Sequence, residues 1–206
     1  MLRRDRMAAP PGVAARRGVG ATAPRVSRPS ECCRPDRLVA GGGGLKPRPR
    51  SSRGALTGPS PVDRARTGSK HHLLVDADGA PLAVALTGGN RNDITQLLPL
   101  VDGITPVKGK VGRPRQRPDR IVADRGYDHD NYRHELRRRG VEPVIARRGT
   151  KHGSGLGRWR WVVERTFAWL HNYRRLRIRW ERDPAVHMAF LTLACALMCR
   201  RYLREF

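Results

Sequence analysis

Two carboxylates, Asp124 and Glu164, have the residue type and setting that best suit chemistry in this chain. Asp124 follows the short apolar run 121–123, and the Arg-Gly pair behind it marks a sharp exit from a strand. Glu164 lies among tryptophan, valine, phenylalanine and arginine residues, as on an amphipathic helix. Carboxylates that converge from a strand end and a helix can hold two divalent ions about 4 Å apart at a phosphodiester. The pair therefore suggests metal-assisted phosphoryl transfer.

Each carboxylate also has an ordinary structural explanation. Asp124 could be a turn or helix-cap aspartate, and on spacing alone this explanation is slightly favoured. Glu164, flanked by Arg160 and Arg165, could be an ion-paired residue on a solvated helix face. The residues taken singly leave both alternatives open.

The charge balance points to a polyanionic partner. Lysine and arginine number 42 against 18 aspartate and glutamate residues, for a net charge of +24. Such an excess neutralises phosphates and releases their counterions, which makes nucleic acid the expected partner. A ribosome-associated structural protein and a membrane-surface binder are the alternatives. The longest apolar run, 189–199, is shorter than the roughly 20 residues of a membrane span, so no membrane partner is expected.

The sequence divides near residue 54. Residues 1–54 are rich in arginine, glycine and proline without apolar periodicity, and they are predicted to be disordered. Residues 55–206 are predicted to form one α/β domain. Its expected strands are 71–75, 81–87, 120–123 and 141–146, and its expected helices are 93–101, 130–139, 158–173 and one from 184 onward. Asp93 is expected to cap the first helix, and residues 174–179 are expected to be extended with one basic face. The four cysteines lack zinc-site spacing, which favours reduced thiols in the cytoplasm.

Several motifs agree in order and spacing with one bacterial family. They are residues 57–64, 68–72, 87–93, 123–128 and 161–169. In these motifs the chain resembles the DDE transposases of insertion sequences, in the insertion-sequence-five group, from about Thr57 to its C-terminus. The resemblance implies an RNase H-like fold, a mixed sheet flanked by helices. It also implies that two aspartates and one glutamate bind Mg²⁺ or Mn²⁺, cut the ends of the element and join them to target DNA.

The resemblance assigns roles to particular positions. Asp124 matches the second catalytic aspartate and Glu164 the glutamate, so both are expected to bind metal. Arg160 matches the arginine four positions ahead of that glutamate. Two positions depart from the family's helix signature, because Gly157 replaces a tyrosine and His171 replaces a basic residue.

The first catalytic aspartate is not identified. The family places it on an opening strand just before the Thr57 segment, where this chain has Pro, Arg, Ser and Gly residues. Asp36, Asp63 and Asp76 do not match that position. We therefore expect the first strand to be missing, which would expose a sheet edge, and we hypothesise that residues 1–54 are a frameshifted translation fused to a genuine transposase segment.

Partners follow from charge and resemblance together. DNA, as element ends and as target, is the expected partner of a homo-oligomer associated with the bacterial nucleoid. The candidate DNA-binding residues are Arg160, Arg165, Lys110, Arg113, Arg115, Arg147, Arg148, Arg174 and Arg175. The loop around Arg113 could enter a minor groove or touch phosphates without specificity. Three functions remain: an active transposase, a DNA-binding remnant that cannot cut, favoured for this chain, and an RNA-associated structural protein.

Overall fold

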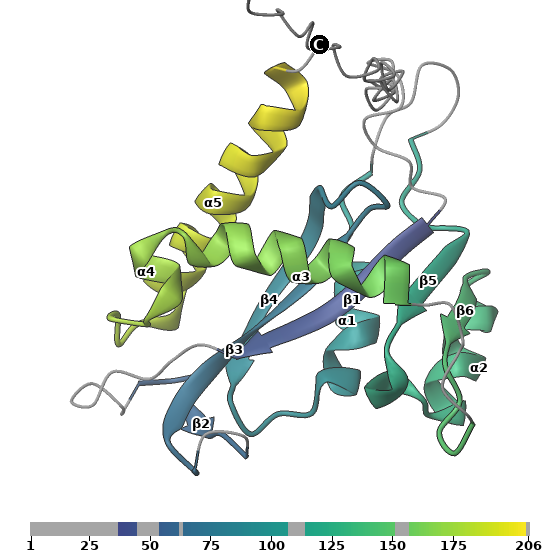
Figure 1. The fold of residues 1–206 in the computed structure, drawn as a ribbon, viewed down its shortest axis with the longest axis horizontal. Helices are drawn as coiled ribbons and strands as arrows, with labels where there is room; N and C mark the ends of the chain where they lie inside the picture. The colour runs from purple at the N-terminus through teal and green to yellow at the C-terminus, as the bar shows by residue number, and fades with distance from the viewer. Residues whose placement is uncertain (1–36, 45–53, 62–63, 107–113, 151–156, 205–206) are drawn as a thin grey trace, which may run out of the picture.

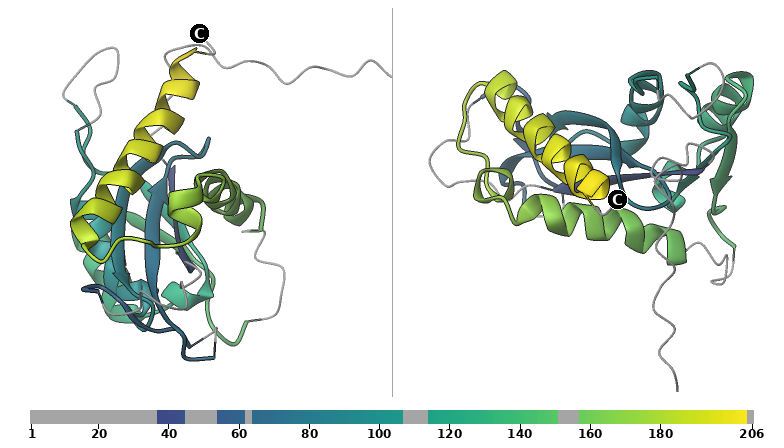
Figure 2. Two further views of the ribbon diagram at one scale, coloured as in Figure 1. Left: turned by 90° about the vertical axis from the view of Figure 1, so that its left-hand side faces the viewer. Right: turned by 90° about the horizontal axis from the view of Figure 1, so that it is seen from above.

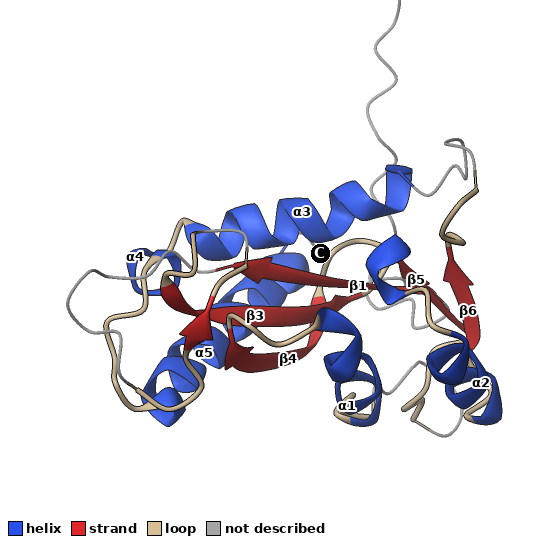
Figure 3. Cartoon of the chain, turned by 90° about the horizontal axis from the view of Figure 1, so that it is seen from below, coloured by secondary structure: helices blue, strands red, loops and turns tan. Residues whose placement is uncertain are grey.

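A mixed sheet with helices on both faces forms the described part of the protein (Figures 1 and 3). The structure is a computed structural model that describes residues 37–44, 54–61, 64–106, 114–150 and 157–204. Its elements are β1 (Arg37–Gly44), β2 (Gly58–Pro59), β3 (Thr67–Val75), β4 (Pro81–Gly88), the 3₁₀ helix η2 (Asp93–Gln96), α1 (Leu97–Asp102), β5 (Arg120–Ala123), the 3₁₀ helix η3 (Arg125–Tyr127), α2 (Asp130–Arg138), β6 (Glu142–Ile145), α3 (Gly157–His171), α4 (Arg174–Arg177) and α5 (Pro184–Arg204). The expected α/β class with a mixed sheet is confirmed.

The sheet combines an antiparallel part and a parallel part. β4, β3 and β1 pair antiparallel, whereas β1, β5 and β6 run parallel. β2 pairs with the first two residues of β3. The β3–β4 connection is the expected hairpin, in which Gly79 has a φ of 95° that only glycine adopts readily. β1 is therefore the strand that joins the hairpin to the β5–β6 unit.

The presence of β1 corrects the expectation of a missing first strand. Residues 37–44 form a central strand, with Val39 opposite Val75 of β3 and level with Val122 of β5. Val39 and Ala40 are buried, and the glycines that follow keep pairing with β3 through their backbone. The exposed sheet edge expected at this place is therefore covered. The rest of the predicted disordered segment, 1–36 and 45–53, lies outside the described residues, as do Lys110 and Arg113.

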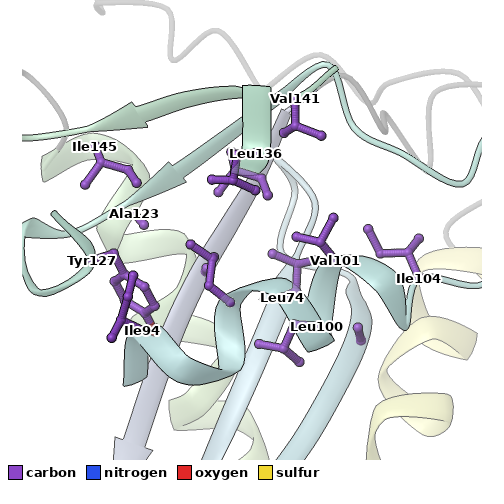
Figure 4. Close-up of a cluster of buried hydrophobic side chains, with 14 residues drawn as sticks. Leu74, Ile94, Leu100, Val101, Ile104, Ala123, Tyr127, Leu136, Val141 and Ile145 are labelled. Carbon is purple, nitrogen blue, oxygen red and sulfur yellow. The ribbon is translucent and has the colours of Figure 1, made fainter. Parts of the chain in front are cut away.

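One apolar core lies between the sheet and the helices η2, α1 and α2. Alternation along the strands turns Ala40, Leu74 and Ile121 to this face. They meet buried residues of the covering helices, and Figure 4 shows the cluster. The covering residues include Ile94, Leu97, Leu100, Val101, Tyr127 and Leu136. This core fixes the turn that follows β5, because Tyr127 belongs to it.

A second core lies on the opposite face, under α3, α4 and α5 (Figure 2). Val39, Leu73, Val75 and Val122 are its buried sheet residues. The helices contribute Val162, Val163, Phe167, Leu170, Leu176, Leu191, Ala194, Cys195 and Met198. The thiol of Cys199 lies 3.6 Å from the carbonyl of Pro81, where α5 runs along β4. Cys195 and Cys199 of α5 are free thiols.

Two local expectations were wrong. Residues 174–177 form a helical turn, α4, because Leu176 is buried in the second core, and Arg179 is buried instead of lying on an exposed basic face. Asn92, not Asp93, caps the helical segment, since its side chain accepts from the Ile94 amide. Asp93 instead forms an ion pair with Lys70, at 3.0 Å.

Candidate active site

Asp124 lies where the sequence predicted, directly after β5. Its backbone is extended, and its side chain caps η3 by accepting a hydrogen bond from the Gly126 amide at 2.8 Å. The side chain is exposed at the C-terminal edge of the parallel strands, where α/β sheets commonly place functional groups. The capping role that the sequence left open is therefore real. One oxygen is committed to it, and the position still faces solvent.

Glu164 lies in the middle of α3 on the side turned to solvent. Its side chain is 61% exposed and accepts a hydrogen bond from Arg160 Nε at 3.0 Å, one helical turn earlier. The neighbouring residue Val163 is buried against the sheet. The ion pair is thus also real, and the exposure means that a phosphate or a metal ion could compete for either partner.

β1 brings the two carboxylate-bearing elements together (Figure 1). The parallel register pairs Val39 with Val122, so extending it by two residues sets Gly41 level with Asp124. Alternation turns Gly41 to the face covered by α3, where a Cβ atom on it would lie 2.5 Å from Val163 Cγ1. In this extended register Gly41 lies beside Asp124. Gly41 also contacts Val163 of α3, the residue before Glu164.

The described residues do not complete a carboxylate site for two metal ions. No group of three or more histidine, cysteine, aspartate or glutamate side chains suited to a metal ion occurs in the described ranges. The place level with Asp124 on β1 is Gly41, which has no side chain and no room for one. The carboxylates of Asp124 and Glu164 suit hard divalent ions by their chemistry, but the part of the chain that the structure describes offers them no third partner.

The predicted DNA-binding arginines in the described ranges occupy different parts of the surface. Arg115 pairs with Asp119, Arg147 with Asp130 and Arg175 with Glu181. Each of these guanidinium groups is more than half exposed. The Asp119 and Asp130 partners are exposed as well, so a phosphate can replace them at little cost, whereas the Glu181 partner of Arg175 is only 8% exposed. Arg160 is 67% exposed beside Glu164, and Arg174 is exposed on α4.

Arg165 and Arg148 have contacts that serve the fold itself. The Arg165 guanidinium lies over the rings of Trp161 and Trp169, 4.4 and 4.9 Å from their centroids, and donates to the Asp78 carbonyl. Arg148 donates to the carbonyls of Arg125 and Gly126, both at 3.2 Å. These contacts hold α3 to the β3–β4 turn and hold the loop after β6 to the loop after β5.

The sequence did not reveal the buried ion pair next to Asp124. Asp128 and Arg133 are 7% and 6% exposed, and their side chains meet at 2.6 Å. Hydrogen bonds from the Arg148 amide and from Arg133 hold the pKa of the Asp128 carboxyl below its ordinary value. Asp128 belongs to the 123–128 motif, but an aspartate that ends a motif does not by itself indicate a buried partner five residues later.

Comparison with known proteins identifies the class to which this chain belongs. The Transposase DDE domain family matches residues 47–199. The chain is 53% identical to a putative transposase for insertion sequence element IS402 of Burkholderia cepacia, over 99% of this chain and 97% of that protein. It is 32% identical to a putative transposase for insertion sequence element IS6501 of Brucella ovis, over 65% of this chain and 98% of that protein. The chain belongs to the transposase DDE domain family.

Among solved structures, a chain of the simian T-cell lymphotropic virus intasome in complex with PP2A regulatory subunit B56 gamma is similar, with a TM-score of 0.38 and 17% identity. That similarity covers 68% of this chain and 40% of the intasome chain. Within the described part of the chain, no helix combines the length and apolar character needed to cross a bilayer.

Proposed function

We propose that this chain carries most of the catalytic domain of an insertion-sequence transposase, in which Asp124 and Glu164 hold Mg²⁺ or Mn²⁺ during DNA cleavage and strand transfer. The family membership and the convergence of Asp124, Gly41 and α3 support the proposal. Divalent ions in such sites stabilise charge on the attacking and leaving oxygens. The described residues supply no third carboxylate beside these two, so the chain as printed binds DNA and does not cut it.

The glycine run of β1 suggests where the missing aspartate is encoded. Four glycines in a central strand are unusual, since glycine weakens a strand and packs nothing. Read one nucleotide later, the codons of residues 41–44 give three triplets of the form GNG, which encode valine, alanine, glutamate or glycine. The triplet across Gly44 and Leu45 becomes GNC or GNT, which encodes aspartate when N is adenine. The same nucleotides can therefore encode an apolar strand that ends in aspartate.

The coding DNA tests the frame directly. We expect adenine as the third base of the Gly44 codon, and an alternative frame without a stop codon from residue 38 until it joins the present frame before Thr57. The alignment with the Burkholderia cepacia relative takes in 99% of this chain, so the same arrangement is expected in that coding sequence. A stop codon in this stretch, or another third base at Gly44, would remove the frameshift hypothesis and leave the DNA-binding remnant.

Cleavage and strand-transfer assays on DNA that carries the element ends test the activity. We expect products with Mg²⁺ or Mn²⁺ only from a chain whose upstream frame is restored, and their loss in Asp124→Asn and Glu164→Gln of that chain. Asp130→Asn is the matched control, because Asp130 is an exposed carboxylate six residues from Asp124. Activity of the printed chain that is lost in Asp124→Asn would refute the claim that it cannot cut.

DNA binding by the exposed arginines is tested by its salt dependence. Each phosphate contact contributes about 0.9 to the slope of log K against log salt on B-DNA. Arg174→Gln should reduce the magnitude of that slope by about 0.9, the contribution of one phosphate contact, with little dependence on DNA sequence. Equal binding of RNA and DNA, without any effect of divalent ions, would favour the RNA-associated structural protein. Sedimentation of the DNA complex would show whether the chain assembles into the homo-oligomer that we propose.

A further inference from the structure

Hydrogen bonds from the end of β6 and the loop after it hold the loop that follows Asp124. We call this set of contacts the β5–β6 clamp; its residues are Arg125, Asp128, Arg133, Arg148 and Thr150. Among the described residues, Asp124 accepts hydrogen bonds from its near neighbours, the Gly126 and Tyr127 amides, at 2.8 and 3.1 Å. Its side chain is exposed, so no packing fixes its direction. The position of the carboxylate therefore depends on what holds the following residues.

The buried centre of the clamp is the Asp128–Arg133 ion pair. Asp128 Oδ1 accepts from Arg133 Nε at 2.9 Å and from Nη2 at 2.6 Å, and its other oxygen accepts from the Arg148 amide at 2.7 Å. Arg133 also donates to the carbonyl of Ile145, the last residue of β6, at 2.8 Å. The ion pair thus joins the end of β6 to the loop that follows β5.

Arg148 completes the clamp from the surface side. Its Nε donates to the Arg125 carbonyl and its Nη2 to the Gly126 carbonyl, both at 3.2 Å. In return, Arg125 Nη2 donates to the Thr150 carbonyl at 2.8 Å. The two carbonyls held by Arg148 belong to the same short turn whose Gly126 amide binds Asp124. A guanidinium group occupied in this way is a poorer phosphate ligand than that of Arg147, which pairs only with carboxylates.

We propose that Arg148 is a positioning residue for Asp124, anchored by the Asp128–Arg133 pair, and not mainly a DNA contact. Removing a group that orients a metal ligand commonly lowers the metal affinity about 10- to 100-fold. The effect on metal binding rests on the proposed function. The effect on the turn itself does not.

Arg148→Gln in the full chain, with Arg147→Gln as the charge-matched neighbour, tests this proposal. Amide hydrogen exchange at Gly126 should speed up about tenfold or more in Arg148→Gln, with exchange in β3 and β4 unchanged, because only the turn opens. Paramagnetic broadening by Mn²⁺ around residue 124 should then need roughly tenfold more metal. Arg147→Gln removes a 3.7 Å contact with Asp128 and the pair with Asp130, but no hydrogen bond to the turn. It should change both quantities far less than Arg148→Gln and should weaken DNA binding more.

The outcomes separate the two proposals. Unchanged Gly126 exchange in Arg148→Gln would overturn the positioning role, whatever the metal data show. Absence of Mn²⁺ broadening at residue 124 in the parent chain would count against the proposed metal site, while the exchange result would still decide the clamp. Asp128→Asn provides a second test, since it keeps the shape of the side chain and should open the same turn more strongly.

Discussion

The Nε2 atoms of His71 and His187 lie 3.0 Å apart in the buried contact between β3 and α5. His187 Nδ1 lies 3.2 Å from a Glu181 carboxylate oxygen, which can only accept, so His187 carries its proton on Nδ1 and accepts at Nε2. His71 must then donate from Nε2. This hydrogen bond is lost once His187 is protonated, because both rings would then present N–H groups to each other.

Lowering the pH should therefore weaken the contact between α5 and β3 and reduce the free energy of unfolding. Burial is the main cause that lowers the pKa of both His71 and His187, and for His71 the neighbouring histidines and Arg179 lower it further. A lowered histidine pKa gives stability that is complete above about pH 6.5 and is lost as the pH falls. Between pH 7.5 and 5 we expect a loss on the order of 1–2 kcal/mol per histidine in urea unfolding. His187→Phe should flatten this dependence, whereas His134→Gln, at an exposed histidine, should not. Equal slopes in the parent chain and His187→Phe would contradict the assignment.

Asp76 should respond to pH in the opposite sense. Burial raises the pKa of its carboxyl to about 6, although the Ala80 and Asp78 amides donate to Oδ1 at 2.8 and 3.0 Å. Its contribution to stability is complete below the ordinary pKa and is lost as the pH rises through about 6. Asp76→Asn should therefore gain about 1 kcal/mol over the parent chain on going from pH 5 to pH 8. Asp119→Asn, at an exposed position, is the control. If the stability of Asp76→Asn and of the parent chain changed with pH in parallel, the Asp76 carboxyl would not be perturbed.

Gly41 and Val163 should show strong energetic coupling. A methyl group at residue 41 would lie 2.5 Å from Val163 Cγ1, so Gly41→Ala should cost about 1–3 kcal/mol through overpacking. Val163→Ala makes room for that methyl group, and the double variant should be more stable than the sum of the single effects predicts. Chemical unfolding of the four proteins measures the coupling. Strictly additive effects would mean that β1 and α3 do not contact each other here.

Arg179 should not tolerate lysine. Its buried guanidinium group donates to the Ser69 hydroxyl at 2.5 Å and to four backbone carbonyls, which belong to Ala55, Leu56, Glu181 and Arg182. A lysine has three donors on a point charge and cannot reproduce this planar set, so Arg179→Lys should cost about 2–4 kcal/mol. Arg177→Lys, at an exposed position on α4, should be within about 0.5 kcal/mol of the parent chain. Similar stabilities of the two variants would rule out this role for Arg179.

The elements with clear local signals could be predicted from the sequence. The hairpin around Gly79, the strand before Asp124 and the helix that carries Glu164 all lie where apolar periodicity and turn residues placed them. The position of Asp124 at a strand end followed from the same signals. These features depend on neighbouring residues, and so a single sequence contains most of the information needed.

Features that depend on distant partners could not be predicted. β1 has only three apolar residues before its glycines, and it is a strand because β3 and β5 pair with it on both sides. Arg179 appeared to belong to a basic exposed stripe, and its burial depends on carbonyls more than a hundred residues earlier in the chain. Asp128 and Arg133 pair across a turn whose geometry is set by β6. In each case the tertiary contact overrode the local pattern.

The place of β1 also bears on how this chain assembles. The hairpin β3–β4 and the β5–β6 unit can each form from nearby segments, but they become one sheet only when β1 closes contacts across some eighty residues of sequence. The glycines of β1 offer backbone pairing and almost no side-chain burial. Pairing of β1 with one neighbour alone therefore gains too little free energy to offset the loss of chain entropy, until both β3 and β5 are in place. We therefore expect β1 to be the last strand to join the sheet during folding, and its pairing with β3 and β5 to be the first to open when the sheet separates.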